Sequence, residues 1–324
     1  MNMHHNTYIT TKMEHPLMNN NIFDSSNGVR TRSYRLGRHL FQKVFAAFAV
    51  LTLFALSLAG CGSSGEKVVK VALRAPYKII YDALNQELAA RGDKIKVVTS
   101  TYDTSTDTSQ LLVDHDVDIA ATIHSAALKA AQKKNPPFND VVRLGYIHMQ
   151  GSSLYSHKYK SVAAIPDGAT ISIPSDTSNQ ARALYNLQTM GLIKVDMTVP
   201  YPTPRNITSN PKNLKFKEIT TQLQVRTLDD VDAGFVLTTQ AYDAKLDLKS
   251  ALWGESTDFK KYPEQRQYII MFTVLKENLN NPTYKKVVEA YHSPRVYKAY
   301  VKEYGNALVP VDNQGNAVDL KQYA

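Results

Sequence analysis

The feature that most constrains the fold is an alternation of strand-like and helix-like segments, which begins at Val68 and runs past residue 300. Short β-branched or apolar runs are typical of strands, and apolar residues at three- to four-residue spacing are typical of helices. Strands are predicted at 68–73, 94–98, 117–121, 141–148, 170–174, 214–219, 233–237 and 268–274. Helices are predicted at 77–91, 110–113, 125–134, 178–190, 239–245 and 282–304, the last with a break at Pro294. This alternation predicts an α/β fold around a largely parallel sheet.

The predicted strands are too numerous for one small sheet, so we expect two lobes. The first part of lobe 1 is placed at 68–148, lobe 2 at 149–267, and the second part of lobe 1 at 268–324. The junctions are expected in segments rich in Gly, Ser and Tyr, around 149–158 and 258–268.

The segment before the first strand has the pattern of an export signal. A basic stretch precedes an apolar run of about 16 residues, shorter than the roughly 20 that a permanent membrane-spanning helix needs. The run ends in Leu58-Ala59-Gly60-Cys61, which resembles a bacterial lipobox. We therefore predict a disordered extension plus signal peptide at 1–60, a lipidated Cys61, and a flexible tether at 61–67. An ordinary signal peptide or anchor helix with a chance cysteine is the alternative.

Cys61 is the only cysteine of the 324 residues, so the fold has no internal disulfide. Two or three acyl chains such as palmitate would hold a protein on a membrane, where one chain would not. The sequence thus predicts a lipid-anchored protein on the extracytoplasmic face of the cell membrane.

Charge and motifs give no indication of catalysis or nucleic-acid binding. The formal net charge is +9, but the cations occur as short pairs such as Lys133-Lys134 instead of a clustered patch. The sequence has no phosphate-binding loop, no metal-ligand pair and no Gly-rich dinucleotide turn, and Ser, His and Asp are not spaced as a nucleophile elbow. We predict no enzyme, no cofactor and no metal.

Three stretches carry a resemblance to a known family. Residues 173–182 and 187–194 resemble V-P-N-D-P-T-N-x-x-R followed by L-Q-x-x-G-L-I-K. Residues 210–215 with 228–230 form the second stretch, and residues 287–293 resemble a helix that ends in Q-A-Y-x-S. In order and spacing, nearly all of 68–308 resembles the NlpA/MetQ-type substrate-binding lipoproteins of ABC importers. The resemblance implies a periplasmic-binding-protein-like fold with a ligand cleft between its lobes, and a permease and an ATPase as partners.

The resemblance also implies residues for the ligand's head group. Arg182 matches the arginine that binds the ligand's α-carboxylate, which a guanidinium fork suits bidentately; a surface salt bridge is the alternative. Asn179 lies at the start of the same helix, where backbone amides favour an anion. His124 matches a histidine near the ligand, with a packed or capping histidine as the alternative. Thr239 falls where the family has an asparagine that holds the amino-acid head.

The departures from the family lie in the side-chain pocket. Thr122 replaces the aromatic that lines the methionine pocket, and Ala127 replaces a tyrosine. Tyr102 is the tyrosine available near the usual position in lobe 1. Arg74 is an extra cation that binds a second acidic group or is a solvated surface residue. Apolar walls supply most of a small ligand's burial, so the loss of the aromatic wall should weaken the binding of methionine, with an affinity worse than micromolar. The ligand classes that remain open are methionine, another amino acid, a short peptide and an organic acid.

The combined expectation is a lipid-anchored binding protein that delivers a small carboxylate ligand to a membrane permease. A lipoprotein of the same fold that acts as an adhesin or sensor is the alternative, favoured by the changed pocket, and an enzyme is a more remote one. Arg182→Ala is expected to weaken binding and to leave the melting temperature of the ligand-free protein almost unchanged.

Overall fold

The structure is a computed structural model that describes residues 65–75, 77–103, 106–305 and 307–323. The predicted signal peptide, Cys61 and most of the tether lie outside the described residues. Ser64–Ala324 form one compact unit. Within the described ranges, no helix combines the length and the apolar character that crossing a membrane requires.

The helices and strands follow the predicted alternation closely. The strands are β1 (Lys67–Leu73), β2 (Ile95–Thr101), β3 (Ile119–His124), β4 (Val141–Met149), β5 (Ser152–Tyr155), β6 (Thr170–Pro174), β7 (Lys194–Val195), β8 (Ile207–Ser209), β9 (Lys215–Ile219), β10 (Ala233–Leu237), β11 (Trp253–Gly254), β12 (Ile269–Leu275) and β13 (Val309–Pro310). The α-helices are α2 (Lys78–Ala90), α3 (Thr108–Val113), α4 (Ser125–Lys134), α5 (Thr177–Thr189), α6 (Thr238–Asp243), α7 (Pro282–Tyr291) and α8 (Pro294–Tyr304). The 3-10 helices are η1 (Pro136–Asp140), η2 (Val162–Ala164), η3 (Pro204–Asn206), η4 (Thr221–Leu223), η5 (Val225–Thr227), η6 (Leu248–Ser250), η7 (Pro263–Tyr268), η8 (Lys276–Asn278) and η9 (Leu320–Tyr323). The predicted break at Pro294 is confirmed.

The first sheet has six strands in the order β13-β4-β12-β3-β1-β2. β1 pairs parallel with β2 and β3, whereas β12 pairs antiparallel with β3 and β4, and β13 antiparallel with β4. The prediction of a largely parallel sheet is therefore wrong for this sheet. A parallel neighbour needs a crossover connection, but β12 enters from the second sheet and is free to run in the opposite direction.

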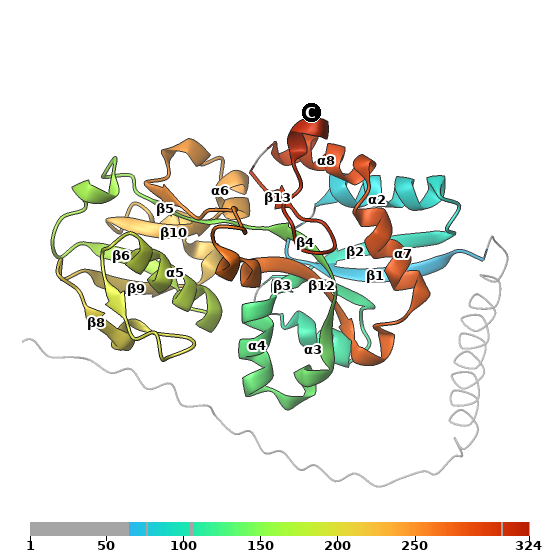
Figure 1. The fold of residues 1–324 in the computed structure, drawn as a ribbon, viewed down its shortest axis with the longest axis horizontal. Coiled ribbons are helices and arrows are strands. Elements are labelled where there is room, and N and C mark those ends of the chain that lie inside the picture. Colours follow the sequence, from blue (N-terminus) through green and yellow to red (C-terminus); the bar gives the residue numbers. More distant parts are fainter. Residues whose placement is uncertain (1–64, 76, 104–105, 306, 324) are drawn as a thin grey trace, which may run out of the picture. The chain divides into compact units, whose positions relative to one another are not determined.

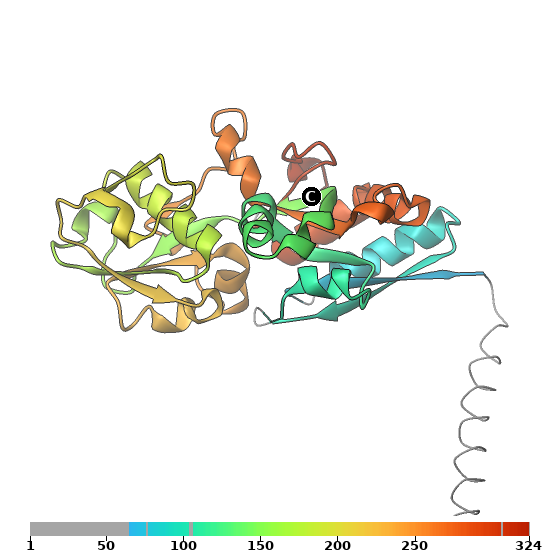
Figure 2. The same ribbon diagram turned by 90° about the horizontal axis from the view of Figure 1, so that it is seen from below.

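The second sheet has five strands in the order β11-β5-β10-β6-β9. β6 pairs parallel with β9 and β10, and β5 pairs antiparallel with β10 and β11. Its elements gather apart from those of the first sheet (Figures 1 and 2). The expected junction at 149–158 is shorter than predicted, because β5 occupies Ser152–Tyr155 and only residues 150 and 151 separate it from β4.

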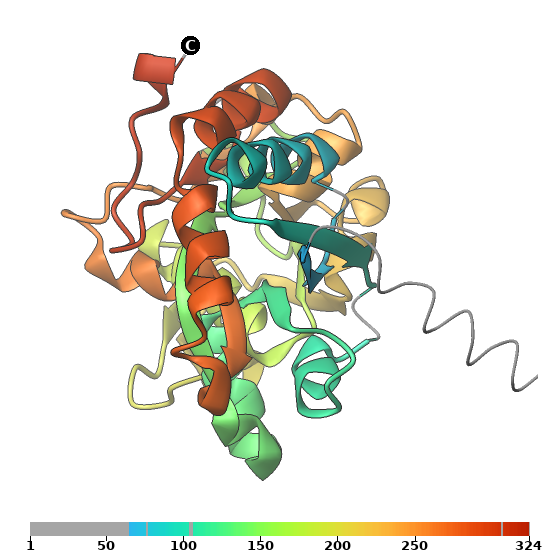
Figure 3. The same ribbon diagram turned by 90° about the vertical axis from the view of Figure 1, so that its right-hand side faces the viewer.

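Apolar side chains cover both faces of the first sheet. Leu84, Tyr291 and Tyr300 belong to a core between one face and helices α2, α7 and α8 (Figure 3). Leu112 and Leu128 pack on the other face, where α3 and α4 lie. We call this sheet with α2, α3, α4, α7 and α8 the first-sheet region. The second sheet with α5 and α6 is the second-sheet region, and it has its own core.

Local sequence signals position the elements that carry the site. Asp176 caps α5 by accepting a hydrogen bond from the Asn179 amide, and Gly191 ends the helix with a φ of 75°, a conformation that glycine adopts without strain. The carboxyl ends of parallel strands meet at one sheet edge, which is where α/β proteins bind ligands. Arg74, Tyr102 and His124 follow or end β1, β2 and β3 at that edge.

Candidate ligand-binding site

Arg182 forms a buried ion pair with Glu255. The Nε of Arg182 donates to Oε1 of Glu255 at 2.8 Å, and its Nη2 donates to Oε2. The same Nη2 donates to the backbone carbonyl of Gln150 at 2.8 Å. The two charged side chains are 3% and 0% exposed. The pair is therefore part of the protein interior.

Glu255 also receives hydrogen bonds from two neutral groups. Asn186 donates its Nδ2 at 2.7 Å, and the backbone amide of Ser152 donates at 2.9 Å. Each carboxylate oxygen thus accepts two hydrogen bonds, which compensates the cost of burying the charge. These donors lie on α5 and β5 of the second-sheet region.

This pairing corrects two expectations for Arg182. Its guanidinium fork, predicted for a ligand carboxylate, is filled by Glu255 and Gln150. Within the described ranges, Nη1 is the guanidinium nitrogen that makes no hydrogen bond. The alternative of a surface salt bridge is also wrong, because the bridge is buried. Removing Arg182 would leave the buried Glu255 carboxylate without its cation. The melting temperature of Arg182→Ala is therefore no longer expected to stay unchanged.

Tyr268 and His124 line the other side of Arg182. The guanidinium carbon of Arg182 lies 4.3 Å from the centroid of the Tyr268 ring, a cation–π distance. Tyr268 meets the His124 ring edge-to-face at 5.3 Å. Burial raises the pKa of Tyr268. Tyr268 therefore bridges Arg182, from α5, and His124, at the end of β3.

His124 caps α4, as its structural alternative predicted. Its Nδ1 accepts a hydrogen bond from the Ala127 amide at 3.2 Å, so the neutral ring carries its proton on Nε2. That Nε2 is buried with no partner of good geometry in the described part of the chain. Burial, and secondly the charge of Arg182, lower the pKa of His124 to about 4. The ring is therefore neutral at pH 7.

Asn179 lies beside His124, but its backbone and side-chain N–H groups already donate hydrogen bonds within the protein. Its backbone N–H donates to Oδ1 of Asp176 at 3.0 Å, and its side-chain nitrogen donates to the same carboxylate. The predicted anion site at this helix start is thus occupied by the protein's own Asp176. The Oδ1 of Asn179 is buried without a hydrogen-bond partner in the described residues and interacts with His124.

Thr239 joins the cluster through Gln150. Gln150 lies between β4 and β5; its carbonyl accepts from Arg182, and its side chain donates to the Thr239 hydroxyl. Thr239, on α6, is 7% exposed. The structure therefore brings Arg182, His124, Asn179 and Thr239 into one cluster.

The remaining predicted residues form a separate group on the first-sheet region. The Thr122 hydroxyl lies 2.6 Å from the Thr108 hydroxyl. Arg74 donates to the carbonyls of Asp103 and Thr106, and burial lowers its pKa. Arg74 is thus tied to the loop between β2 and α3 and is not a fully solvated side chain. Tyr102 packs against the apolar core on the α3 side. Among the described residues, no recorded contact joins Arg74 or Tyr102 to Arg182.

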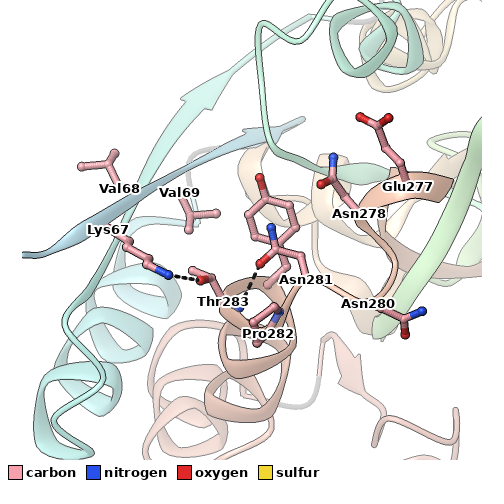
Figure 4. A pocket seen from close by; sticks show the side chains of 10 residues that line it. Lys67, Val68, Val69, Glu277, Asn278, Asn280, Asn281, Pro282 and Thr283 are labelled. Carbon is pink, nitrogen blue, oxygen red and sulfur yellow. Dashed lines mark hydrogen bonds between the residues drawn. The ribbon is translucent and has the colours of Figure 1, made fainter.

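A cavity of about 710 Å³ lies at the opposite end of β1. Lys67, Val69 and Asn281 are among its lining residues, and Lys67 donates to the Thr283 hydroxyl at 3.4 Å (Figure 4). It contains none of the residues of the Arg182 cluster. We do not assign the ligand site to it, because it lies at the amino end of β1 and not at the carboxyl edge. In the described residues, no cluster of His, Cys, Asp and Glu fits a metal ion.

The comparison with protein families decides the assignment. The family model described as NlpA lipoprotein matches residues 69–312. The chain belongs to the NlpA lipoprotein family. The match includes both sheets and every residue of the Arg182 cluster.

Relatives agree with the family match along most of the chain. The methionine-binding lipoprotein MetQ of Bacillus subtilis is 31% identical over 282 residues, which are 83% of this chain and 99% of the relative. A nutrient-binding protein from Burkholderia cenocepacia, solved with methionine bound, is 28% identical with a TM-score of 0.66, and the match covers 75% of this chain and 99% of that one. The substrate-binding protein of a methionine transporter from Streptococcus pneumoniae is 30% identical with a TM-score of 0.67, over 75% and 95% of the two chains.

Family and fold together identify a substrate-binding protein with the two-lobe fold of the periplasmic binding proteins. Sequence reasoning missed Glu255, Gln150, Asn186 and Tyr268. Asn186 had a signal, since it lies four residues after Arg182 and so shares its helix face. For Glu255 there was no such signal, because its hydrogen-bond partners are distant in the sequence.

Proposed function

We propose that this chain is a lipid-anchored substrate-binding protein of an ABC importer. It captures a small ligand that carries an α-carboxylate and delivers it to a membrane permease and its ATPase. The family match and the relatives named for methionine binding support this role. Capture and release require no chemistry on the ligand, so we propose no enzymatic activity.

The observation that carries the proposal is the remaining donor of Arg182 in a buried cluster where the two regions meet. Arg182 and Asn179 come from the second-sheet region, and His124 comes from the first. A guanidinium nitrogen that donates no hydrogen bond within the described residues suits one carboxylate oxygen. Thr239, His124 and Tyr268 then surround the head group.

The ligand enters when the two regions part. Polar contacts that join them include hydrogen bonds from the Tyr201 hydroxyl to the Ala126 carbonyl at 3.0 Å, from Lys134 to the Thr177 hydroxyl at 3.0 Å, and from Tyr242 to the Glu303 carbonyl. Polar contacts of this kind are weak enough to break in a hinge motion. A ligand that touches both sides favours the closed state. The lobe boundaries 68–148, 149–267 and 268–324 remain part of the proposal, supported by which strands share a sheet.

The ligand is an amino acid or a short peptide, and free methionine binds weakly. Thr122, Tyr102 and Arg74 form the wall that would contact the ligand's variable part. A threonine in the place of an aromatic ring leaves less apolar area against a thioether. Thr122 is also held by Thr108, which keeps a polar hydroxyl pair at this wall.

Membrane attachment is proposed through Cys61. Cys61→Ser should move the protein from the membrane fraction to the soluble or secreted fraction. Fractionation of cells expressing both forms measures this, and unchanged membrane association would contradict the lipid anchor.

The decisive experiment for transport function is mass spectrometry of small molecules released when the purified protein is denatured. We expect one amino acid or short peptide in near-stoichiometric amount. Calorimetric titration of the ligand-free protein with that compound should then give saturable binding. A neighbouring permease and ATPase gene would agree with transport, whereas an orphan gene and no released ligand would favour the adhesin or sensor alternative.

A further inference from the structure

Glu255 compensates the charge of the arginine that is proposed to hold the ligand. Its carboxylate takes the Nε–Nη2 edge of Arg182, and both side chains are withdrawn from water. The pair as a whole is neutral. Any role of this pair towards a ligand rests on the proposed function.

The other charges near the pair do not add a cation. His124 is neutral at pH 7, because burial and Arg182 lower its pKa to about 4. Asp176 acts on His124 from the start of α5 and carries a negative charge. The buried pair of Arg182 and Glu255 sums to zero, and Asp176 is exposed, so that water screens its negative charge. A charge that is buried without compensation is strongly disfavoured, so a ligand of net negative charge should bind poorly here.

We propose that Glu255 sets the charge selectivity of the site: it leaves Arg182 one free donor nitrogen in a neutral pair, so that a zwitterionic head group is accepted and a ligand with a carboxylate alone is rejected. Glu255 is a specificity-determining residue that acts through Arg182 and makes no contact with the ligand. The same pairing would make the site poor for organic acids, one of the ligand classes that the sequence left open.

The test uses three probes that share a side chain: L-methionine, 4-(methylsulfanyl)butanoate, which lacks the amine, and L-methionine methyl ester, which lacks the carboxylate. Ligand-observed NMR on the full chain in detergent measures affinities even in the millimolar range. We expect the wild type to bind methionine at least about tenfold more tightly than the acid without the amine. Glu255→Gln keeps the side-chain shape, removes the charge, and should reduce this ratio at least about tenfold.

Glu87→Gln is the matched control. Glu87 accepts from Arg91 at 2.9 Å and from Arg295 at 3.1 Å near the surface, so the substitution changes the net charge equally but far from the cluster in the fold. Its ratio should equal that of the wild type. The proposal is overturned if Glu255→Gln and Glu87→Gln give the same ratio, or if the wild type binds methionine and the acid equally.

Two further outcomes are distinguishable. If Glu255→Gln does not fold, as circular dichroism would report, the wild-type series decides: weaker binding of both the acid and the ester supports a neutral pair, and equal binding of the acid overturns it. If the wild type binds none of the three probes and releases no amino acid or peptide on denaturation, the proposed function itself fails and takes this inference with it.

Discussion

The two sides of the site differ in how firmly their polar groups are held. On the second-sheet region, Arg182 and Glu255 are fully buried and each carboxylate oxygen accepts two hydrogen bonds. On the first-sheet region, Thr122 has one hydroxyl partner and is only partly buried. We propose that the firmly held polar groups form a rigid side, which binds the head group shared by the ligands, and that the wall at Thr122 forms a replaceable side, which contacts the part that varies.

A second difference concerns histidines that are buried or partly buried. His124, His148 and His292 all lie in the first-sheet region, and burial is the first cause that lowers the pKa of each. In the second-sheet region the described histidine is His157, which is exposed and pairs with Asp229. Acid should therefore act mainly on the first-sheet region, whereas charge substitutions should act mainly on the second.

The largest expected effect is on the rigid side. Arg182→Ala should lower the free energy of unfolding by about 3–5 kcal/mol, because it leaves the Glu255 carboxylate buried and unpaired. Urea unfolding followed by circular dichroism measures it. Arg295→Ala is the control: its partner Glu87 is near the surface, and loss of an exposed pair costs about 0.2–1 kcal/mol. Equal losses would remove the distinction between the two sides.

The next effect is a loss of stability in acid. The pKa of His124, His148 and His292 falls to about 4, 3 and 4 in the folded protein, from an ordinary value of 6.5. Below pH 6.5 these histidines therefore bind protons in the unfolded chain but stay neutral in the folded protein. Stability is complete above about pH 6.5 and is lost as the pH falls towards 4, by up to roughly 3 kcal/mol for each group.

Hydrogen exchange at pH 7.5 and pH 5 measures the protection of backbone amides in each of the two regions separately. Segments of the first-sheet region should lose more protection than those of the second. His124→Asn keeps a capping side chain and should flatten part of the pH dependence of unfolding. Uniform loss of protection in both regions would refute the localisation.

A smaller effect is expected where both sheets are tightly packed. Gly234→Ala would place its Cβ 2.3 Å from the Ser172 hydroxyl, which donates to Gln224 at 2.7 Å. Gly145→Ala in the first sheet would place its Cβ 2.7 Å from a methyl group of Val288. Overpacking of this kind costs about 1–3 kcal/mol. Thermal unfolding measures both; we expect Gly234→Ala to lose more, since a hydrogen bond must move as well. If either variant lost less than about 0.5 kcal/mol of its free energy of unfolding, the core would accommodate the added methyl group without strain.

The smallest effect is on the replaceable side. Thr122→Phe restores an aromatic wall and should tighten methionine binding about tenfold, since burying an apolar side chain contributes about 1.5–3 kcal/mol and part of that is lost in reshaping the pocket. Titration with L-methionine measures it, with Thr122→Val as the control that removes the hydroxyl without adding a ring. Nanomolar methionine binding by the wild type would mean that other residues already form the wall.

The long elements could be predicted from the sequence, but the short strands could not. The stripe over 77–91 and the β-branched run at 68–73 appear as α2 and β1 within a residue or two. β7, β11 and β13 have two residues each, too few to carry a period. Their strand character comes from a neighbour that offers hydrogen-bond partners.

For the candidate site, too, some features could be predicted from the sequence and others could not. The motif from Ile173 to Lys194 placed Arg182 and Asn179 on one helix, and α5 forms there with Asp176 as its cap. By itself, the sequence determined the order of the elements, the family, and which arginine we propose for the ligand. The tertiary structure alone decided what this arginine contacts: Glu255 lies 73 residues away in the chain, and Tyr268 follows later still. Local periodicity records which face of a helix is buried, but not which distant charge is buried with it.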